Sequence, residues 1–211
     1  MRKLVSILGS GLGLSILLAY LNFAFGWVVL SDRLSLVLAF AIGPVAVFGT
    51  LALSENLMRV FGTSTLRVGT IFLVIAFALL TLMLTMQQAI FVEYQLLLEA
   101  TAEPKALASL KASFALVNQI QLGADVAFDI FYSLGIIFVS SVLVRSKGFE
   151  RVIGAYGVLA GTGLLVLNLW FFPTPPAVAE SIDLGPATII WWVALFVLDG
   201  RLNKRGVSGH A

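Results

Sequence analysis

Two carboxylates one helical turn apart, Asp125 and Asp129, are the residues of this chain with the clearest capacity for chemistry. If their segment is helical, a rotation of about 100° per residue brings them onto one face with three neutral polar residues. These three are Asn118, Gln121 and Ser133. Because two such close negative charges repel each other, a shared proton or a bound cation would relieve the repulsion. Oxygen ligands suit Ca²⁺, Mg²⁺ or Na⁺ rather than transition metals, so the identity of any metal stays unknown.

Polar residues at the ends of other apolar segments are candidate partners for these carboxylates. Arg33 is the only strong cation predicted near a span end on the same side, which makes it the obvious counterion for either aspartate. A buried aspartate that is protonated, or paired with Arg33 and Gln88, would instead serve only to fix the helix register, and this alternative stays open. The predicted ligand or ion pocket consists of Asp129, Asp125, Gln88, Asn168, Gln121 and Arg33.

The composition indicates a protein that is solvated by lipid. Of the 211 residues, 60% are hydrophobic and 11% are charged, whereas a soluble domain carries about 25% charged residues. The net charge is only +2 and the basic residues form no patch, which argues against nucleic-acid binding. The chain has no cysteine and its only histidine is His210, near the C-terminus. Disulfides and thiol chemistry are therefore excluded, and we expect no cofactor.

Six apolar segments are long enough to cross a bilayer, which takes about 20 residues each. They span residues 5–29, 34–54, 67–92, 123–145, 152–172 and 183–200. The first is uncharged over residues 4–31, which is longer than the 7–15 residues typical of a signal peptide. We therefore predict an all-α, polytopic membrane helical bundle with six transmembrane helices, which forms a single domain over residues 1–211.

The basic residues of the chain predict its orientation. Ten of the thirteen Lys and Arg residues fall on one side of the predicted spans and three on the other. By the positive-inside rule, both termini are then cytoplasmic in a multi-pass protein of the inner (plasma) membrane. The ten are Arg2, Lys3, Arg59, Arg67, Arg145, Lys147, Arg151, Arg201, Lys204 and Arg205, and the three are Arg33, Lys105 and Lys111.

The longest connection, residues 93–122, lies on the outer side. Pro104 can open a helix there, because its missing N–H is not needed at the first position. Apolar residues then recur at helical spacing, at Leu107, Leu110, Phe114 and Val117. This pattern predicts an outer amphipathic helix before span four, although an extension of span four itself fits the pattern equally well.

Small and aromatic residues near the end of the chain predict how its helices pack. Gly154, Gly157 and Gly161 share one face of the fifth span, which permits close approach of another helix. Asn168 falls close to the same line, so we expect it to lie at this contact and to form a hydrogen bond across it. Three tryptophans, Trp170, Trp191 and Trp192, are interpreted as an aromatic belt at the membrane surface.

The C-terminal ninety residues resemble a widespread group of uncharacterised six-span bacterial inner-membrane proteins. The resemblance rests on the segment Gly123-Ala124-Asp125 to Asp129, the glycine-rich fifth span and the Pro-rich outer loop at residues 172–176. It implies a bacterial inner-membrane location. It implies no activity and assigns no role to any position.

Three functions remain compatible with these residues. The first is binding or transport of a cation or a protonated polar solute at the outer acidic pocket. The second is a noncatalytic partner or sensor subunit, which packs against another membrane protein or a second copy within the membrane lipids. The third is an enzyme that acts on lipid headgroups through Asp129, Asp125 and Gln88. Without a recognisable nucleophile–base pair or metal-ligand cluster, the sequence favours the enzyme least.

Overall fold

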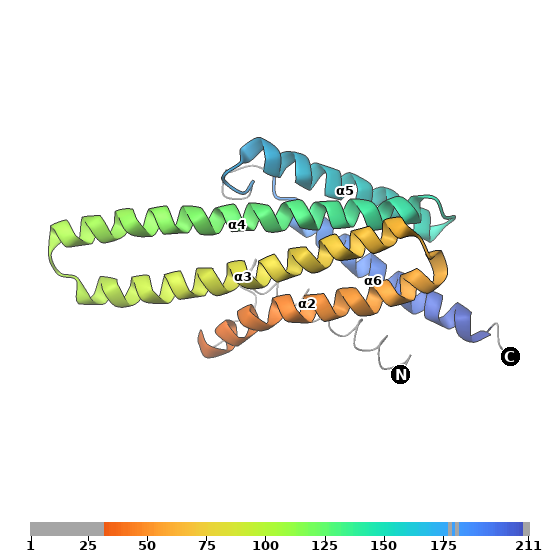
Figure 1. Ribbon diagram of the computed structural model, residues 1–211, viewed down its shortest axis with the longest axis horizontal. Coiled ribbons are helices and arrows are strands. Elements are labelled where there is room, and N and C mark those ends of the chain that lie inside the picture. Colours follow the sequence, from red (N-terminus) through yellow and green to blue (C-terminus); the bar gives the residue numbers. More distant parts are fainter. Residues whose placement is uncertain (1–31, 177–178, 180–181, 209–211) are drawn as a thin grey trace.

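Helices account for the whole secondary structure of the described chain. The computed structural model describes residues 32–176, 179 and 182–208, which form five helices and no strand. The helices are α2 (Asp32–Phe61), α3 (Ser64–Ala100), α4 (Pro104–Val144), α5 (Phe149–Phe171) and α6 (Gly185–Ser208) (Figure 1). Each contains a stretch long and apolar enough to cross a membrane, as expected of a helical membrane bundle. The predicted first span, residues 5–29, lies outside the described residues.

Local capping explains where α3 and α4 begin. The Thr63 side chain accepts a hydrogen bond from the backbone N of Leu66 at 3.3 Å, at the start of α3. The Glu103 carboxylate accepts hydrogen bonds from the backbone N of Lys105 and of Ala106, at 3.1 and 2.6 Å. Pro104 follows this cap at the first helical position, where its missing N–H costs nothing. These caps leave only short turns, so α2, α3 and α4 run antiparallel to their chain neighbours.

The predicted outer amphipathic helix before span four does not exist as a separate element. Residues 104–122 belong to α4, which continues without a break through Gly123 for 41 residues. At 1.5 Å per residue, α4 is about 60 Å long and α3 about 55 Å, well beyond the ~30 Å of a hydrocarbon core. The helical spacing of Leu107, Leu110 and Phe114 serves packing within a hairpin: the Phe114 ring stacks on Tyr94, with centroids 3.9 Å apart.

The α3–α4 hairpin keeps one register along its length. Gly135 packs against Leu73 on α3, and the Tyr94–Phe114 stack continues the same alignment toward the turn. Near that turn the two helices extend past α5 and α2 and project from the bundle (Figure 1). This projecting part ends in the turn at residues 101–103.

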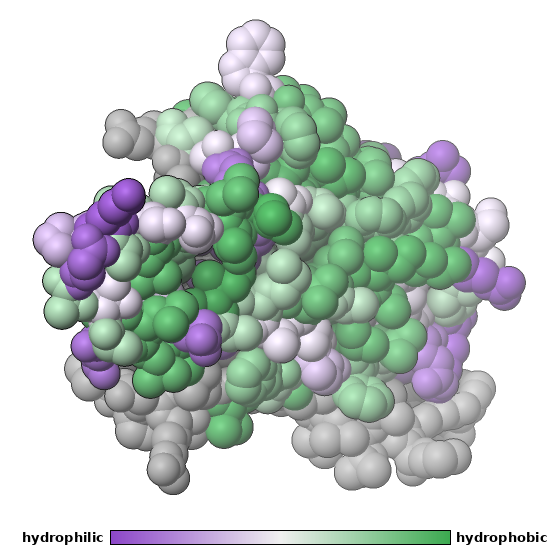
Figure 2. Space-filling model, turned by 60° about the vertical axis from the view of Figure 1, so that its left-hand side comes forward, coloured by the Kyte–Doolittle hydropathy of each residue, from purple (hydrophilic) through white to green (hydrophobic). Residues whose placement is uncertain are grey.

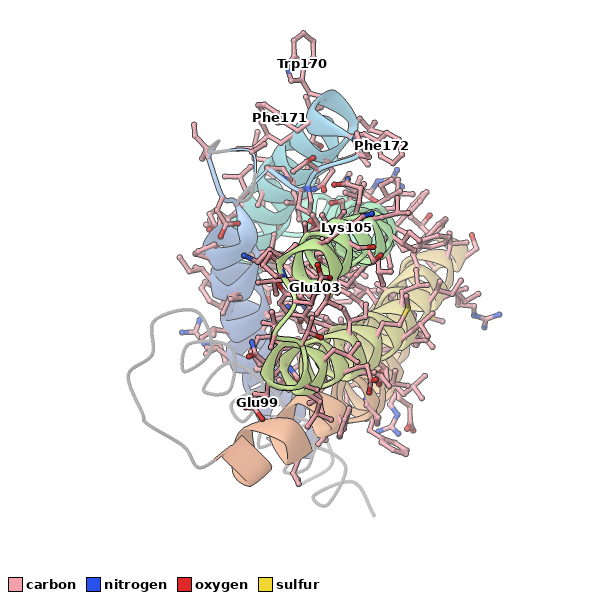
Figure 3. The ribbon with its side chains drawn as sticks, turned by 90° about the vertical axis from the view of Figure 1, so that its left-hand side faces the viewer. Glu99, Glu103, Lys105, Trp170, Phe171 and Phe172 are labelled. Carbon is pink, nitrogen blue, oxygen red and sulfur yellow. The ribbon has the colours of Figure 1, made fainter. Side chains whose placement is uncertain are left out.

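The other three helices pack around the hairpin. On the α3 side, Thr70 of α3 donates a hydrogen bond to Ser54 of α2, with the hydroxyl oxygens 2.9 Å apart. α5 packs on α4, and α6 lies against one face of the hairpin, where Trp192 contacts Phe77 at 5.7 Å between ring centroids. No described helix covers the opposite face (Figures 1 and 3). Figure 2 shows hydrophobic side chains across the middle of the molecule and hydrophilic ones toward the two sides of the view.

Trp191 does not belong to the predicted aromatic belt. Trp191 is 0% exposed and belongs to the core, where it makes an edge-on contact with Trp192. Trp192 in turn stacks on Phe196. Only Trp170, at 81% exposure, points away from the bundle, beside Phe172 at the end of α5 (Figure 3). The belt prediction is therefore wrong for Trp191, because α6 turns this face toward α4 and α5.

A candidate polar site between α4, α5 and α6

The glycine face of α5 determines which side of α4 is buried here. A side-chain carbon at Gly161 would lie only 3.1 Å from the backbone oxygen of Ser133 and from the Ile136 side chain. A carbon at Gly157 would collide with Ser140 and with Trp191 of α6. The predicted close approach at these glycines is confirmed. Asp129 lies one turn before Ser133 on the same face of α4, so it also looks toward α5.

Asn168 connects α5 to Asp129. It lies two turns beyond Gly161, is fully buried, and its side chain lies beside the Asp129 carboxylate. Its amide nitrogen also donates to the backbone oxygen of Leu164 at 3.0 Å. The amide oxygen, Oδ1, is buried without a hydrogen-bond partner among the described residues. The prediction that Asn168 lies at the helix contact is thus confirmed, whereas the hydrogen bond of its amide nitrogen goes to Leu164 of its own helix.

Asp125 and Asp183 complete an acidic group at this end of the bundle. Asp183 precedes α6, and its Oδ1 accepts a hydrogen bond from the backbone N of Gly185 at 2.7 Å. Asp183 interacts electrostatically with both Asp125 and Asp129. Within the described residues, neither aspartate of α4 forms an ion pair with Lys or Arg. The three carboxylates therefore create a local negative potential that attracts cations.

The predicted pocket also included Gln121, Gln88 and Arg33, and Gln88 lies elsewhere. Gln121 is buried one turn before Asp125, and the hairpin register puts Gln88 level with Ile120. Gln88 is therefore about nine residues along α4 from the level of Asp129, or roughly 13 Å. Arg33 belongs to the first turn of α2, which packs on α3 and α6 rather than on α4. The structure brings together Asp125, Asp129 and Asn168 and leaves Gln88 outside that group, whereas the side chain of Arg33 is not among those described.

Asp183 is the member of this group that the predicted pocket lacked. Its sequence context, just before Gly185 and Pro186, marks a helix start, and the Gly185 hydrogen bond confirms that role. Its approach to Asp125 depends on the path of the loop between α5 and α6, for which the sequence carries no local signal. Within the described part of the chain, no three Asp, Glu, His or Cys side chains are grouped so that they could hold a metal ion.

The site offers negative charge and hydrogen-bond acceptors. Its acceptors are the carboxylates of Asp125 and Asp129 and the unpartnered Oδ1 of Asn168. Such a set can hold a proton or a hydrogen-bonding cation. Comparison with protein-family models, with curated proteins and with solved structures finds no match to this chain.

Proposed function

We propose that this chain is a six-span bacterial inner-membrane protein, with both termini in the cytoplasm, that binds a cation at Asp129 near its outer surface. The observation that carries the proposal is the half-buried position of Asp129 beside Asn168 and two further aspartates, without a basic partner among the described residues. A partly buried carboxylate of this kind needs a proton or a cation to balance it. A passing or bound cation supplies that balance.

A protonated amine is the cation that fits these acceptors best. An ammonium group carries three N–H donors in a compact positive charge. Asp129, Asp125 and the free Oδ1 of Asn168 offer one acceptor position each. Charge-assisted hydrogen bonds of this type are about twice as strong as neutral ones. The ligand class is therefore a small primary amine, with a monovalent metal ion as the simpler alternative.

The orientation follows from the distribution of charge between the two ends of the bundle. Arg59, Arg67, Arg145, Lys147 and Arg151 lie in or beside the turns at one end, opposite the acidic site. The positive-inside rule assigns the basic end to the cytoplasm. The aspartates and the hairpin turn then face outward.

Cysteine labelling tests this orientation, because the chain contains no cysteine of its own. We expect Ala102→Cys, in the exposed hairpin turn, to react with a membrane-impermeant maleimide in intact cells. Ser64→Cys, exposed at the basic end, should react only after the membrane is permeabilised. The reverse labelling pattern would show that the acidic site faces the cytoplasm.

Cation-dependent thermal stabilisation tests the binding site. Purified protein is unfolded by heat with methylammonium, spermidine, Na⁺ or Ca²⁺ at constant ionic strength. A ligand present at 100 times its Kd should stabilise the wild type by about 2.7 kcal/mol. Asp129→Asn keeps the shape of the side chain and removes its charge, so we expect it to abolish this gain.

Glu99→Gln is the matched control, since it removes one negative charge at the exposed tip of the hairpin, far from the site (Figure 3). It should retain the full cation response. The proposal fails if none of the four cations stabilises the wild type, or if Asp129→Asn responds as strongly as the wild type does.

A further inference from the structure

An open cavity of about 490 Å³ lies at the basic end of the bundle. It is bounded by Phe61 at the end of α2, Gly148 just before α5 and Leu202 of α6, and we call it the basic-end cavity. The turn between α4 and α5, on the right in Figure 1, forms part of its lining. Ligand pockets in proteins have volumes of about 300–1,000 Å³, so this space can hold a small ligand or a lipid headgroup.

The basic-end cavity lies at the depth of lipid headgroups. Exposed Trp170 and the acidic group around Asp125 mark one membrane surface. About 20 residues of α4, or roughly 30 Å, separate Asp125 from the turn that follows Val144. This length matches the thickness of a hydrocarbon core. The turn and the cavity beside it therefore lie at the second membrane surface.

One part of the cavity lining is apolar. It consists of Val60 and Phe61 of α2, Phe149 of α5 and Leu202 of α6. Val60 is 53% exposed, so this apolar lining extends onto the outer surface of the bundle. The glycerol backbone and first chain carbons of a lipid can cover these side chains, whereas a small soluble anion would leave them in contact with water.

The other part of the lining is polar and lies beside two cations. Ser146 and Lys147 belong to the turn between α4 and α5, and the Lys147 side chain is exposed. The guanidinium carbon of Arg201 lies 4.3 Å from the centroid of the Phe149 ring, so a cation–π contact holds Arg201 next to the apolar lining. A guanidinium group presents a planar fork of donors that matches the oxygens of a phosphate group.

The charges at the cavity favour an anion with a single charge. Lys147 and Arg201 contribute two positive charges, and Glu150, the only acid among the described lining residues, contributes one negative charge. The balance is one positive charge, which the single negative charge of a phosphodiester neutralises. A free phosphate group carries about two negative charges at neutral pH and would exceed that balance.

The start of α5 adds hydrogen-bond donors to these cations. Gly148 is the N-cap residue of α5 with φ of 64°, and no side chain in the described part of the chain caps this helix. The first backbone N–H groups of a helix have no partner within the helix and point toward its N-terminus. They supplement Lys147 and Arg201, which give the site its positive charge.

We propose that the basic-end cavity binds the phosphodiester headgroup of an anionic phospholipid. The phosphate group lies at Lys147 and Arg201, and the glycerol backbone covers Val60 and Phe149. This site is roughly 30 Å along α4 from the aspartates, so it stands or falls independently of cation binding.

Lipid titration of the purified protein in mild detergent tests the proposal. The probes are phosphatidylglycerol, phosphatidylcholine with the same acyl chains, the soluble diester glycerophosphoglycerol and inorganic phosphate, all at constant ionic strength. Native mass spectrometry measures the Kd of each probe. We expect phosphatidylglycerol to bind most tightly, because only this probe combines a net negative charge with apolar chains.

Lys147→Gln and Arg201→Gln each remove one of the two cations and should weaken phosphatidylglycerol binding by about fivefold. The matched control is Arg67→Gln, which removes an exposed positive charge at the same end of the bundle but outside the cavity lining. It should bind the lipid as the wild type does. Asp129→Asn should also bind it normally, which separates this site from the aspartate site.

Three outcomes would overturn the proposal. Equal binding of phosphatidylcholine would show that the negative charge of the lipid is not recognised. Equal binding of glycerophosphoglycerol or inorganic phosphate would show that the cavity takes a soluble anion instead of a lipid. A loss of binding in Arg67→Gln as large as in Lys147→Gln and Arg201→Gln would show a general attraction to the basic end rather than a site in this cavity.

Discussion

Gly157→Ala is expected to lower the free energy of unfolding by about 1–3 kcal/mol, because the added carbon overpacks the junction of three helices. That carbon would collide with Ser140 on α4 and with the Trp191 ring on α6. Trp191 is fully buried, so its ring cannot move aside without displacing a helix. Thermal unfolding followed by tryptophan fluorescence measures the effect, with Trp191 as a reporter at the site of change.

Gly123→Ala provides a control in which the free energy of unfolding is expected to rise instead of fall. Gly123 also lies inside a helix, but a side-chain carbon there meets no atom within 4 Å. Alanine favours the helix over glycine by about 1 kcal/mol, so this variant should be more stable than the wild type. If Gly157→Ala matched Gly123→Ala in stability, close packing of α4, α5 and α6 at Gly157 would be contradicted.

A double-mutant cycle is expected to show strong coupling between Asp129 and Asn168 in cation binding. A hydrogen bond to a charged group contributes about 1.5–3 kcal/mol, which corresponds to roughly a 10- to 100-fold change in affinity. Asn168→Ala removes both the amide nitrogen beside Asp129 and the free Oδ1 acceptor. In the wild-type background, Asn168→Ala should lower the affinity for the cation by that factor. In the Asp129→Asn background, it should have no further effect on the cation response.

Asn118→Ala is the control for the amide, since Asn118 lies on the same helix as Asp129 but in the projecting hairpin. It should leave the cation response unchanged. If the Asn168–Asp129 contact only fixes helix packing, Asn168→Ala will lower the melting temperature equally with and without cation. That outcome would assign the pair a structural role and contradict its part in binding.

Much of the molecule follows from local patterns that the sequence displays directly. Long uncharged runs demand helices in lipid, because a helix satisfies every backbone hydrogen bond internally. Asp125, Asp129 and Ser133 share one face because helical rotation depends only on spacing. Gly157 and Gly161 also predicted a close helix contact. A glycine has no side chain, so it permits a neighbouring helix to approach closely whichever helix that neighbour is.

The identity of the neighbour at each face was decided only by the tertiary structure. The spacing of Leu107, Leu110 and Phe114 is the same for a helix on a membrane surface as for one packed on α3. The stacking of Phe114 on Tyr94 shows that this segment packs on α3. Trp191 is buried and Trp170 exposed because α6 packs against the core and the end of α5 does not. Asp183 reaches the acidic group although it follows Asp125 by more than fifty residues in the chain. The spacing of residues shows which of them share one face of a helix. The packing of distant segments determines which residues that face contacts.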